Sequence, residues 1–362
     1  MNVLHQRAWP SLSGSFSPES IAIPSHLIEQ KRILITGAGG SIGSALAHAV
    51  AACKPAQVLL LEASEQALYR IDRELAAPHK PILASVCDAS ALEEVFEQNR
   101  PHIVFHAAAF KHLPLMELHP FAALQNNAVG TFCLTQTAIK YCAEQIILVS
   151  TDKAVDPASI MGASKRIAEL TALALQSSAT KIKAVRLGNV YASQGSAVPL
   201  FQEQIAQQKP VTVTHPDATR YFLTVEQAAA LLLSALSEEF PSAILVPSLT
   251  KPIRIEEIAR TLIQQSSSKS PIIYTGLRPG EKLHEQLLSP NESLLDPSAG
   301  PLRAIRSETI SANEAEEAIE DLQQAIRARN LSQLLRAVGK LIPNYKPSET
   351  LLSRQAQEEC RA

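Results

Sequence analysis

The chain has 362 residues, of which 46% are hydrophobic and 19% charged, and its formal net charge at pH 7 is −2. This composition is typical of a globular protein and excludes a fibrous or largely disordered chain. The near-neutral charge gives no reason to expect nucleic acid or an anionic membrane as a partner, although a local basic cluster would still suit a small dianionic substrate.

The cysteines and the apolar segments narrow the class of protein further. The five cysteines show no CxxC or other zinc-ligand spacing, so we expect reduced thiols, no metal site and a cytoplasmic location. The N-terminus lacks a basic region followed by an apolar stretch, which argues against a signal peptide. No run of about 20 apolar residues occurs, so we expect no membrane insertion.

Short apolar runs alternate with segments of helical length along most of the chain. Residues 1–30 are rich in Ser and Pro and predict an N-terminal extension. The apolar strands with helical crossovers that follow predict an α/β fold of the Rossmann type, a doubly wound parallel sheet covered on both faces. The predicted strands are Arg32–Thr36, Gln57–Leu61, Ile82–Val86, Ile103–His106, Gln145–Ser150 and Ile182–Leu187.

The regular alternation loosens after Gly188, where shorter elements and proline-rich turns follow. We therefore predict a first domain over residues 31–188 and a second, smaller α/β region over residues 189–310. The apolar strand Ala243–Val246 is expected to rejoin the main sheet, so that residues 222–248 count with the first domain.

The end of the chain, residues 311–362, predicts a helical tail. Apolar residues recur at helical spacing in Glu314–Arg327 and again in Leu331–Leu341. Asn330 lies between the two segments and is predicted to cap the second helix.

A glycine-rich turn follows the first predicted strand and precedes a helix-forming run. Such a turn lets backbone N–H groups approach a pyrophosphate, and the helix N-terminus adds partial positive charge. The alternative is a helix cap with close packing alone, but the strand–turn–helix context favours an NAD-binding first domain. The residues expected to contact the cofactor are Gly37, Gly39, Gly40, Ser41, Ile42 and Gly43.

Glu62 follows the second predicted strand. A carboxylate at this place accepts hydrogen bonds from both adenosine ribose hydroxyls and repels a 2′-phosphate, so Glu62 favours NAD(H) over NADP(H). The alternative is a solvated glutamate at the start of the next helix.

Polar residues gather where the fifth predicted strand ends, in Ser150-Thr151-Asp152-Lys153. Open parallel sheets place their chemistry at this end of the strands. Met161 and Lys165 follow at a spacing of four, which puts them on one helix face. The alternative for Asp152–Lys153 is a surface salt bridge or turn, and Met161 taken alone is a core methionine.

Together these motifs resemble the extended short-chain dehydrogenase/reductase superfamily, with Met161 at the tyrosine position of its YxxxK signature. The resemblance narrows to the bacterial polysaccharide-biosynthesis dehydratases that act on UDP-N-acetylglucosamine, in which methionine commonly replaces that tyrosine. It extends from about Lys31 to Tyr345. The segments that carry it are ITGAGGSIGS (35–44), HAAAFKHLPLMELHP (106–120), NNAVGT (126–131), STDKAV (150–155), MGASKRIAE (161–169), VTVTHPDATRYF (211–222) and GLRPGEKLHE (276–285).

The resemblance implies a nucleotide-sugar 4,6-dehydratase, in which NAD+ oxidises C4, water leaves from C5 and C6, and the hydride returns to C6. It assigns Asp152 as the acid at the C6 hydroxyl and Lys153 as the base at C5, provided that burial lowers the Lys153 pKa. Met161 cannot deprotonate the C4 hydroxyl, so Thr151, Lys153 through a water, and Asp152 stay open for that step. Lys165 is expected to hold the nicotinamide ribose.

Further residues of the resembling motifs are expected at the sugar nucleotide. Asn189 follows the last strong strand and is implied as a diphosphate contact, and Lys111 as a cleft residue. Arg220 and Arg278 are candidate diphosphate clamps because guanidinium groups suit phosphate oxygens, and Glu281 follows in the same motif. Each arginine taken alone is a solvated side chain.

Cofactor contacts are also implied for Ala107 and Ala108, and the chain departs from the resembling family near the nucleotides. The family usually has Asp at the position of Ser85, and Asp88 is the nearest acid to it here. Residues 246–250 replace a stretch that usually reads Asp-Met-Gly.

Two other functions compete with the dehydratase. An NAD-dependent 4-epimerase on the same fold has no need for the Asp152–Lys153 pair. A non-catalytic NAD(H)-binding regulatory protein is consistent with Met161 and the altered residues 246–250. The resemblance implies a UDP-sugar as partner and a homo-oligomer.

Overall fold

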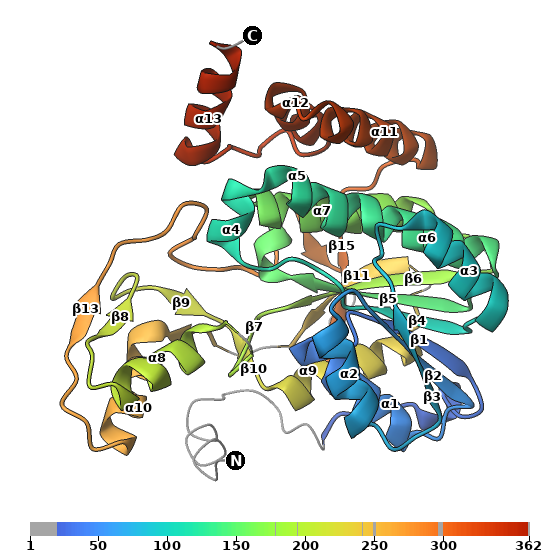
Figure 1. Cartoon of the computed structure of the whole chain (residues 1–362), viewed down its shortest axis with the longest axis horizontal. Helices are drawn as coiled ribbons and strands as arrows, with labels where there is room; N and C mark the ends of the chain where they lie inside the picture. The colour runs from blue at the N-terminus through green and yellow to red at the C-terminus, as the bar shows by residue number, and fades with distance from the viewer. Residues whose placement is uncertain are drawn as a thin grey trace.

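A parallel sheet runs through the centre of the protein (Figure 1). The sheet has nine strands among the described residues, in the order β14-β15-β11-β6-β5-β4-β1-β2-β3. The strands from β11 to β3 pair in parallel, and β15 and β14 form an antiparallel edge. This is the doubly wound Rossmann order, with its switch point between β1 and β4. The computed structural model describes residues 20–177, 179–193, 195–240, 242–248, 251–295 and 300–360.

Most predicted strands lie where the sequence indicates. β1 (Arg32–Thr36) and β4 (Ile103–His106) have the predicted bounds, and β2, β5, β6 and β11 differ by one residue at one or both ends. Only residues 20–30 of the predicted N-terminal extension belong to the described part of the chain. The other strands of the main sheet are β2 (Gln57–Glu62), β3 (His79–Leu83), β5 (Gln145–Thr151), β6 (Lys181–Leu187), β11 (Ser242–Pro247), β14 (Ser293–Leu294) and β15 (Leu302–Arg306).

The prediction of a strand at Ile82–Val86 is wrong, because β3 spans His79–Leu83. β3 lies at the edge of the sheet and pairs with β2 alone. An edge strand needs no continuous apolar run and tolerates Pro81, whose missing N–H would break an inner ladder. The last residue of the apolar run Ile82–Val86 lies outside the strand and belongs to the core, where Val86 is buried against Gly130.

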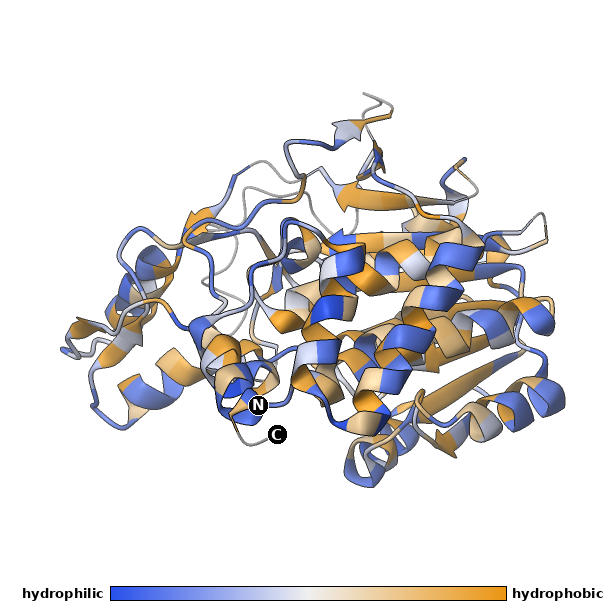
Figure 2. Ribbon diagram, turned by 90° about the horizontal axis from the view of Figure 1, so that it is seen from above, coloured by the Kyte–Doolittle hydropathy of each residue, from blue (hydrophilic) through white to orange (hydrophobic). Residues whose placement is uncertain are grey.

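Alternation along the strands divides the core between the two faces of the sheet. Ile33 and Ile35 pack with α1 and α9 on one face, whereas Leu34 packs with α3 and α6 on the other. Figure 2 shows the strands largely apolar and the outer sides of the helices largely hydrophilic. The helices of the two layers are α1 (Ser41–Ala52), α2 (Glu65–Glu74), α3 (Ala89–Asn99), α6 (Gly130–Lys140), α7 (Ile160–Ala174) and α9 (Val225–Ser234).

A second lobe lies beside the main sheet, at the left in Figure 1. β7 (Asn189–Val190) and β10 (Phe222–Leu223) pair in parallel where the chain enters and leaves it. Phe201, Val213 and Ile258 are buried in the core of this lobe. Its other elements are α8 (Ala197–Ala206), β8 (Val211–Val213), β9 (Thr219–Arg220), β12 (Ile253–Arg254), α10 (Ile255–Gln265) and β13 (Ile272–Tyr274).

The helical tail packs on α5 and α7, on the outer side of one helical layer (Figure 1). The predicted helix Leu331–Leu341 is α12, and Asn330 caps it by accepting a hydrogen bond from the Gln333 N–H at 2.9 Å. Val338 shares a buried cluster with Phe121. None of the described helices is both long and apolar enough to cross a membrane. The helices of this region are α4 (Leu113–Leu118), α5 (Pro120–Leu124), the π-helical turn η4 (Gln125–Val129), α11 (Ala312–Ala328) and α13 (Glu349–Glu359).

A buried ion network ties α7 to the end of β5. Arg186 donates hydrogen bonds to Glu169 at 2.9 Å and to Glu292 at 2.6 Å. Glu169 also accepts the Ser150 hydroxyl at 2.6 Å. Burial alone would raise the pKa of Glu169, but Arg186 and Arg166 lower it to about 2. The network therefore anchors the strand end at which the candidate catalytic residues begin.

Replacing Arg186 with methionine removes the nearer guanidinium from Glu292 and one of two guanidinium partners from Glu169. Among the described guanidinium groups, it leaves both carboxylates with Arg166 alone, at 3.8 and 3.0 Å. We expect R186M to lower the free energy of unfolding by about 3–5 kcal/mol, the usual cost of removing one member of a buried ion pair. Urea denaturation followed by circular dichroism measures the loss. R260M is the control, because Arg260 is exposed and its i,i+4 pair with Glu256 contributes about 0.3–0.5 kcal/mol. Equal losses in the two variants would contradict the anchoring role.

Candidate functional site

The carboxyl ends of the parallel strands open into a cavity of about 620 Å³. It lies at the switch point between β1 and β4, where doubly wound sheets bind their ligands. The glycine turn, the loop after β4, the end of β5, one side of α7 and the segment after β6 form its wall. The residues singled out from the sequence that line it are Gly37, Gly40, Ser41, Ile42, Gly43, Ala107, Lys111, Thr151, Lys153, Met161, Lys165 and Asn189.

The glycine turn leaves no space for side chains at its tightest positions. Gly37 has φ +66°, and a Cβ there would lie 2.7 Å from the Ala108 nitrogen. A Cβ on Gly43 would lie 2.0 Å from the Gly37 carbonyl oxygen. Gly39 packs against Ala67 behind the turn. The first turn of α1 therefore reaches the cavity wall, where its N–H groups suit a pyrophosphate.

Glu62 ends β2 beside this turn. Its carboxylate accepts hydrogen bonds from the Gly39 N–H at 3.1 Å and the Ser64 N–H at 3.0 Å. Arg70 donates to the Gly39 carbonyl at 2.7 Å. These contacts hold an acid where the adenosine ribose of a dinucleotide lies in this fold, so the residues present fit a dinucleotide.

His106 supports the loop after β4 from beneath. Its ring nitrogens lie 2.7 Å from the Thr36 hydroxyl and 2.8 Å from the Thr131 hydroxyl. Burial lowers the pKa of His106 to about 3, and the nearby Lys165 adds to the shift. His106 is therefore neutral at physiological pH, and it stabilises the site through hydrogen bonds to Thr36 and Thr131.

Asn127 lies in the segment NNAVGT (126–131), for which the sequence predicted no individual residue role. Its amide donates to the Ser164 hydroxyl at 2.9 Å and to the Phe110 carbonyl at 2.9 Å. Ser164 in turn donates to the Met161 carbonyl at 2.6 Å. Asn127 thus joins the loop after β4 to α7. A buried asparagine in the π-helical turn η4 is the signal that marks it, since π-bulges occur frequently at functional sites.

Met161 and Lys165 lie one helical turn apart on α7, and both line the cavity. Burial lowers the pKa of Lys165 to about 8, although Glu169 opposes the shift. Met161 also packs in the apolar cluster beneath the tail. It is therefore a core residue and a cavity residue at once, and its thioether has no proton to exchange.

Asp152 and Lys153 begin η5 (Asp152–Ala154), a tight turn that follows β5 directly. Lys153 Nζ donates to Asp152 Oδ1 at 2.9 Å and to Asn189 Oδ1 at 3.0 Å. The Thr151 hydroxyl donates to the same Asp152 oxygen at 2.9 Å. Asp152 is fully buried, whereas Lys153 reaches the cavity with 19% of its side chain exposed. These four residues form one cluster inside the protein, which excludes a surface salt bridge.

One condition drawn from the sequence is wrong: the pKa of Lys153 is raised. Burial alone would lower this pKa, but the carboxylates of Asp152 and Glu285 raise it by more. The side chain of Lys153 is therefore an ammonium ion in this arrangement. For Lys153 to act as a base, its proton must move to another group.

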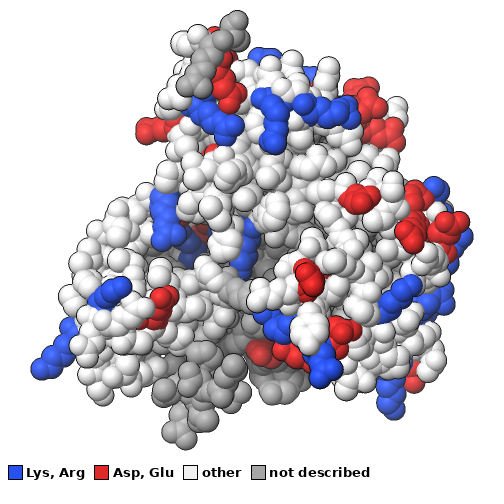
Figure 3. Space-filling model, viewed as in Figure 1, with Lys and Arg blue, Asp and Glu red and all other residues white. Residues whose placement is uncertain are grey.

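Arg220 is buried among carboxylates. Its Nη2 lies 3.0 Å from Glu281 Oε1, and its Nε lies 3.9 Å from Glu285 Oε1. Nη1 donates to the Leu283 carbonyl at 3.0 Å. The structure thus brings Arg220 and Glu281 together, with the guanidinium held by protein acceptors. In Figure 3, basic and acidic side chains gather around the hollow between the second lobe and the helical layers.

Eight of the residues expected at the ligands do not line the cavity, namely Gly39, Glu62, Asp88, Ala108, Asp152, Arg220, Arg278 and Glu281. Two of these, Asp88 and Arg278, are exposed. Asp88 is exposed and caps α3 by accepting a hydrogen bond from the Ala91 N–H at 3.0 Å. Arg278 is exposed on a loop, where its backbone N–H donates to Glu281 at 3.2 Å. The carboxylate of Asp88 is thus used locally, because a helix start needs an acceptor for its N–H groups.

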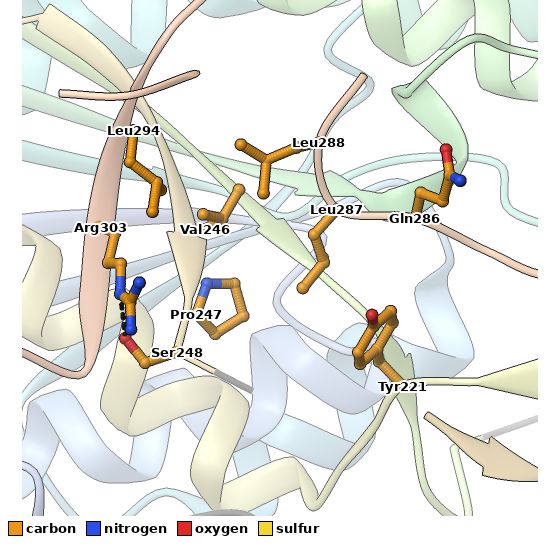
Figure 4. Close-up of a pocket in the computed structure, with 9 residues that line it drawn as sticks. All are labelled: Tyr221, Val246, Pro247, Ser248, Gln286, Leu287, Leu288, Leu294 and Arg303. Atoms are coloured by element: carbon orange, nitrogen blue, oxygen red, sulfur yellow. Dashed lines mark hydrogen bonds between the residues drawn. The ribbon is translucent and has the colours of Figure 1, made fainter. Parts of the chain in front are cut away.

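A second cavity, of about 340 Å³, lies beside β11 and β15 (Figure 4). Val246, Pro247 and Ser248 line it, and Arg303 Nε donates to the Ser248 hydroxyl at 3.2 Å. The other two residues of the altered segment 246–250 lie outside the described residues. The part of that segment that is described therefore faces this second cavity.

The chain is similar to known proteins over most of its length. Residues 33–305 match the family described as "Polysaccharide biosynthesis protein". Capsular polysaccharide biosynthesis protein CapD of Staphylococcus aureus is 41% identical over 283 residues, 75% of this chain and 47% of that protein, so the chain spans about half of its length. UDP-glucose 4-epimerase of Rickettsia rickettsii is 34% identical over 273 residues, 72% of this chain and 79% of that protein. Pen from Bacillus thuringiensis, a solved structure, is 27% identical with a TM-score of 0.69 over 81% of this chain and 99% of that one.

The close contact between Gly43 and the Gly37 carbonyl predicts that a methyl group added at Gly43 would weaken cofactor binding. We expect G43A to weaken NAD+ binding roughly tenfold or more, equivalent to about 1.4 kcal/mol, because its Cβ must push α1 away from the Gly37 carbonyl. Isothermal titration calorimetry measures the affinity. G339A in α12 is the control, since a Cβ there meets nothing within 4 Å. Unchanged affinity in G43A would show that the turn does not hold the dinucleotide.

Proposed function

The chain belongs to the polysaccharide biosynthesis protein family, and on that premise we propose that it is an NAD-dependent nucleotide-sugar 4,6-dehydratase acting on UDP-N-acetylglucosamine. The observation that carries the proposal is the Asp152–Lys153 pair, which lies inside the protein with Lys153 at the cavity wall. An acid and a base side by side are what an elimination across two neighbouring carbons requires.

The glycine turn would hold the pyrophosphate of the dinucleotide, Glu62 its adenosine ribose and Lys165 its nicotinamide ribose. The bound nicotinamide would supply a reversible hydride acceptor for the sugar. Glu62 would repel a 2′-phosphate, so we expect NADP+ to bind more weakly than NAD+ in the same titration. Burial lowers the pKa of Lys165 to about 8, so its neutral form is easier to reach beside a positively charged ring.

Two side chains would carry out the two proton transfers of the elimination. Asp152 would protonate the departing C6 hydroxyl, and Lys153 would remove the C5 proton. Thr151, which donates to the Asp152 carboxylate, orients that acid. Lys111, in the loop after β4, would add positive charge for the diphosphate; its Nζ lies 3.4 Å from the Ser193 hydroxyl at the cavity wall. Arg220 would serve the diphosphate only after its carboxylate partners release it.

A 4-epimerase is the second candidate, favoured by the similarity to the Rickettsia rickettsii epimerase. An epimerase returns the hydride to the carbon that lost it and removes no proton from C5. The Asp152–Lys153 pair would have no use in such a reaction, which is why we place the dehydratase first.

Mass spectrometry of the product separates the candidates. After incubation with UDP-N-acetylglucosamine and NAD+, we expect a nucleotide sugar lighter by one water. An unchanged mass with altered chromatographic retention would instead support the epimerase, and an unaltered substrate would support a non-catalytic NAD(H)-binding protein. UDP-glucose and UDP-N-acetylgalactosamine in parallel reactions define the sugar preference.

Asp152 provides a sharper test of the mechanism. D152N keeps the shape of the side chain and removes its proton, so we expect water loss to fall roughly 100-fold or more, the usual scale of general acid catalysis. NAD+ affinity should stay within about twofold of wild type, because Asp152 is not among the residues proposed to hold the dinucleotide. Steady-state assays and calorimetry give the two numbers. If D152N turns over as wild type does, another group is the acid.

A further inference from the structure

Glu285 reaches the candidate reaction centre from a distant part of the sequence. The segment 281–285 runs beside Thr219 of β9. This places Glu285 Oε1 at 3.6 Å from Lys153 Nζ and 3.9 Å from Arg220 Nε. The Glu285 side chain is 1% exposed. A fully buried acid therefore stands beside the candidate base.

One oxygen of Glu285 has no donor. Glu285 Oε2 is buried and accepts no hydrogen bond from the described residues. A buried carboxylate oxygen without a donor is costly in the charged form and is a natural place for a proton. Consistent with this, burial raises the pKa of Glu285, although Lys153 opposes the rise.

The charged groups that face Lys153 are unequal as proton acceptors. They are Asp152 and Glu285, with Arg220 and Lys282 as neighbouring cations. Asp152 Oδ2 likewise accepts no hydrogen bond from the described residues. In the proposed reaction, however, Asp152 carries the proton that it gives to the C6 hydroxyl, so it cannot also accept the proton of Lys153. Glu285 contacts Lys153 and Arg220 only at 3.6 and 3.9 Å, beyond hydrogen-bond distance. Of the two acids, Glu285 is therefore the one that is open to the proton of Lys153.

We propose that Glu285 is the proton-accepting partner of Lys153. When a sugar fills the cavity, the ammonium gives one proton to the carboxylate, directly or through one water, and Lys153 becomes the neutral amine that the elimination needs. One N–H bond of Lys153 breaks and one O–H bond of Glu285 forms, so the net charge of the pair stays zero. Removing solvent from Lys153 favours this neutral pair over the ion pair. The inference rests on the proposed dehydratase function.

The first test measures the pKa of Lys153 and requires no catalytic turnover. The pH dependence of acylation of the Lys153 amine, followed by peptide mass spectrometry, gives its pKa. We expect E285Q to lower this pKa by about 1–3 units, the effect of removing an opposite charge within 4–6 Å. E257Q, the same substitution at an exposed position of α10, should leave the pKa unchanged. An E285Q protein that titrates as wild type does would overturn the proposal.

The second test uses the reaction. In wild type the proton stays within the Lys153–Glu285 pair. The rate of water loss should therefore change little between about pH 6.5 and about pH 8.5. In E285Q the proton must leave to solvent, so the rate should rise about tenfold per pH unit. E285D retains an acid and should restore the flat profile at a reduced rate. A flat profile in E285Q would overturn proton acceptance by Glu285.

These measurements also separate the inference from the proposed function. If the wild-type protein removes water from no nucleotide sugar, the dehydratase function fails, whereas the acylation result still decides whether Glu285 controls Lys153. Should E285Q not fold, E285D replaces it in the acylation test, since its charge lies one methylene further away. The expected shift is then smaller and of the same sign, and its absence overturns the proposal.

Discussion

The pairing of buried charges at the end of β5 is the constraint on which the rest of the site depends. A parallel strand inside the sheet is apolar, yet here the chain changes to polar residues within the protein interior. Buried charges are stable only when they are paired and hydrogen-bonded. Ser150 is therefore tied to Glu169, and Lys153 is held by Asp152 and Asn189. The first contact anchors the end of β5, and the other two hold Lys153, which the proposed reaction uses.

The same requirement explains why distant segments converge on this place. Glu292, from the loop before β14, completes the partners of Arg186, and Glu285 brings a second acid to Lys153. On the other side of α7, Glu117 accepts hydrogen bonds from the Ile160 N–H at 2.8 Å and from the Ser348 hydroxyl at 2.5 Å. The tail thus supports the helix that carries the signature lysine.

Sequence patterns predicted well whatever depends on neighbours in the chain. The inner strands, the glycine turn and the Asn330 cap follow from local periodicity and turn chemistry. The edge strand β3 was misplaced, because an edge has weak demands on composition. Asp88 is near a predicted cofactor position in the sequence, but in the structure its carboxylate accepts a hydrogen bond from the Ala91 N–H at the start of α3.

The sequence by itself determined the family and the Rossmann type of fold, and it named twelve of the residues that line the cavity, since all of these rest on motifs read within a few residues. Only the tertiary structure decided the charge state of the site. Lys153 is next to Asp152 in the chain, but its pKa also depends on Glu285, more than a hundred residues away. A pKa sums burial and charges from every direction, and folding alone sets which groups are close in space.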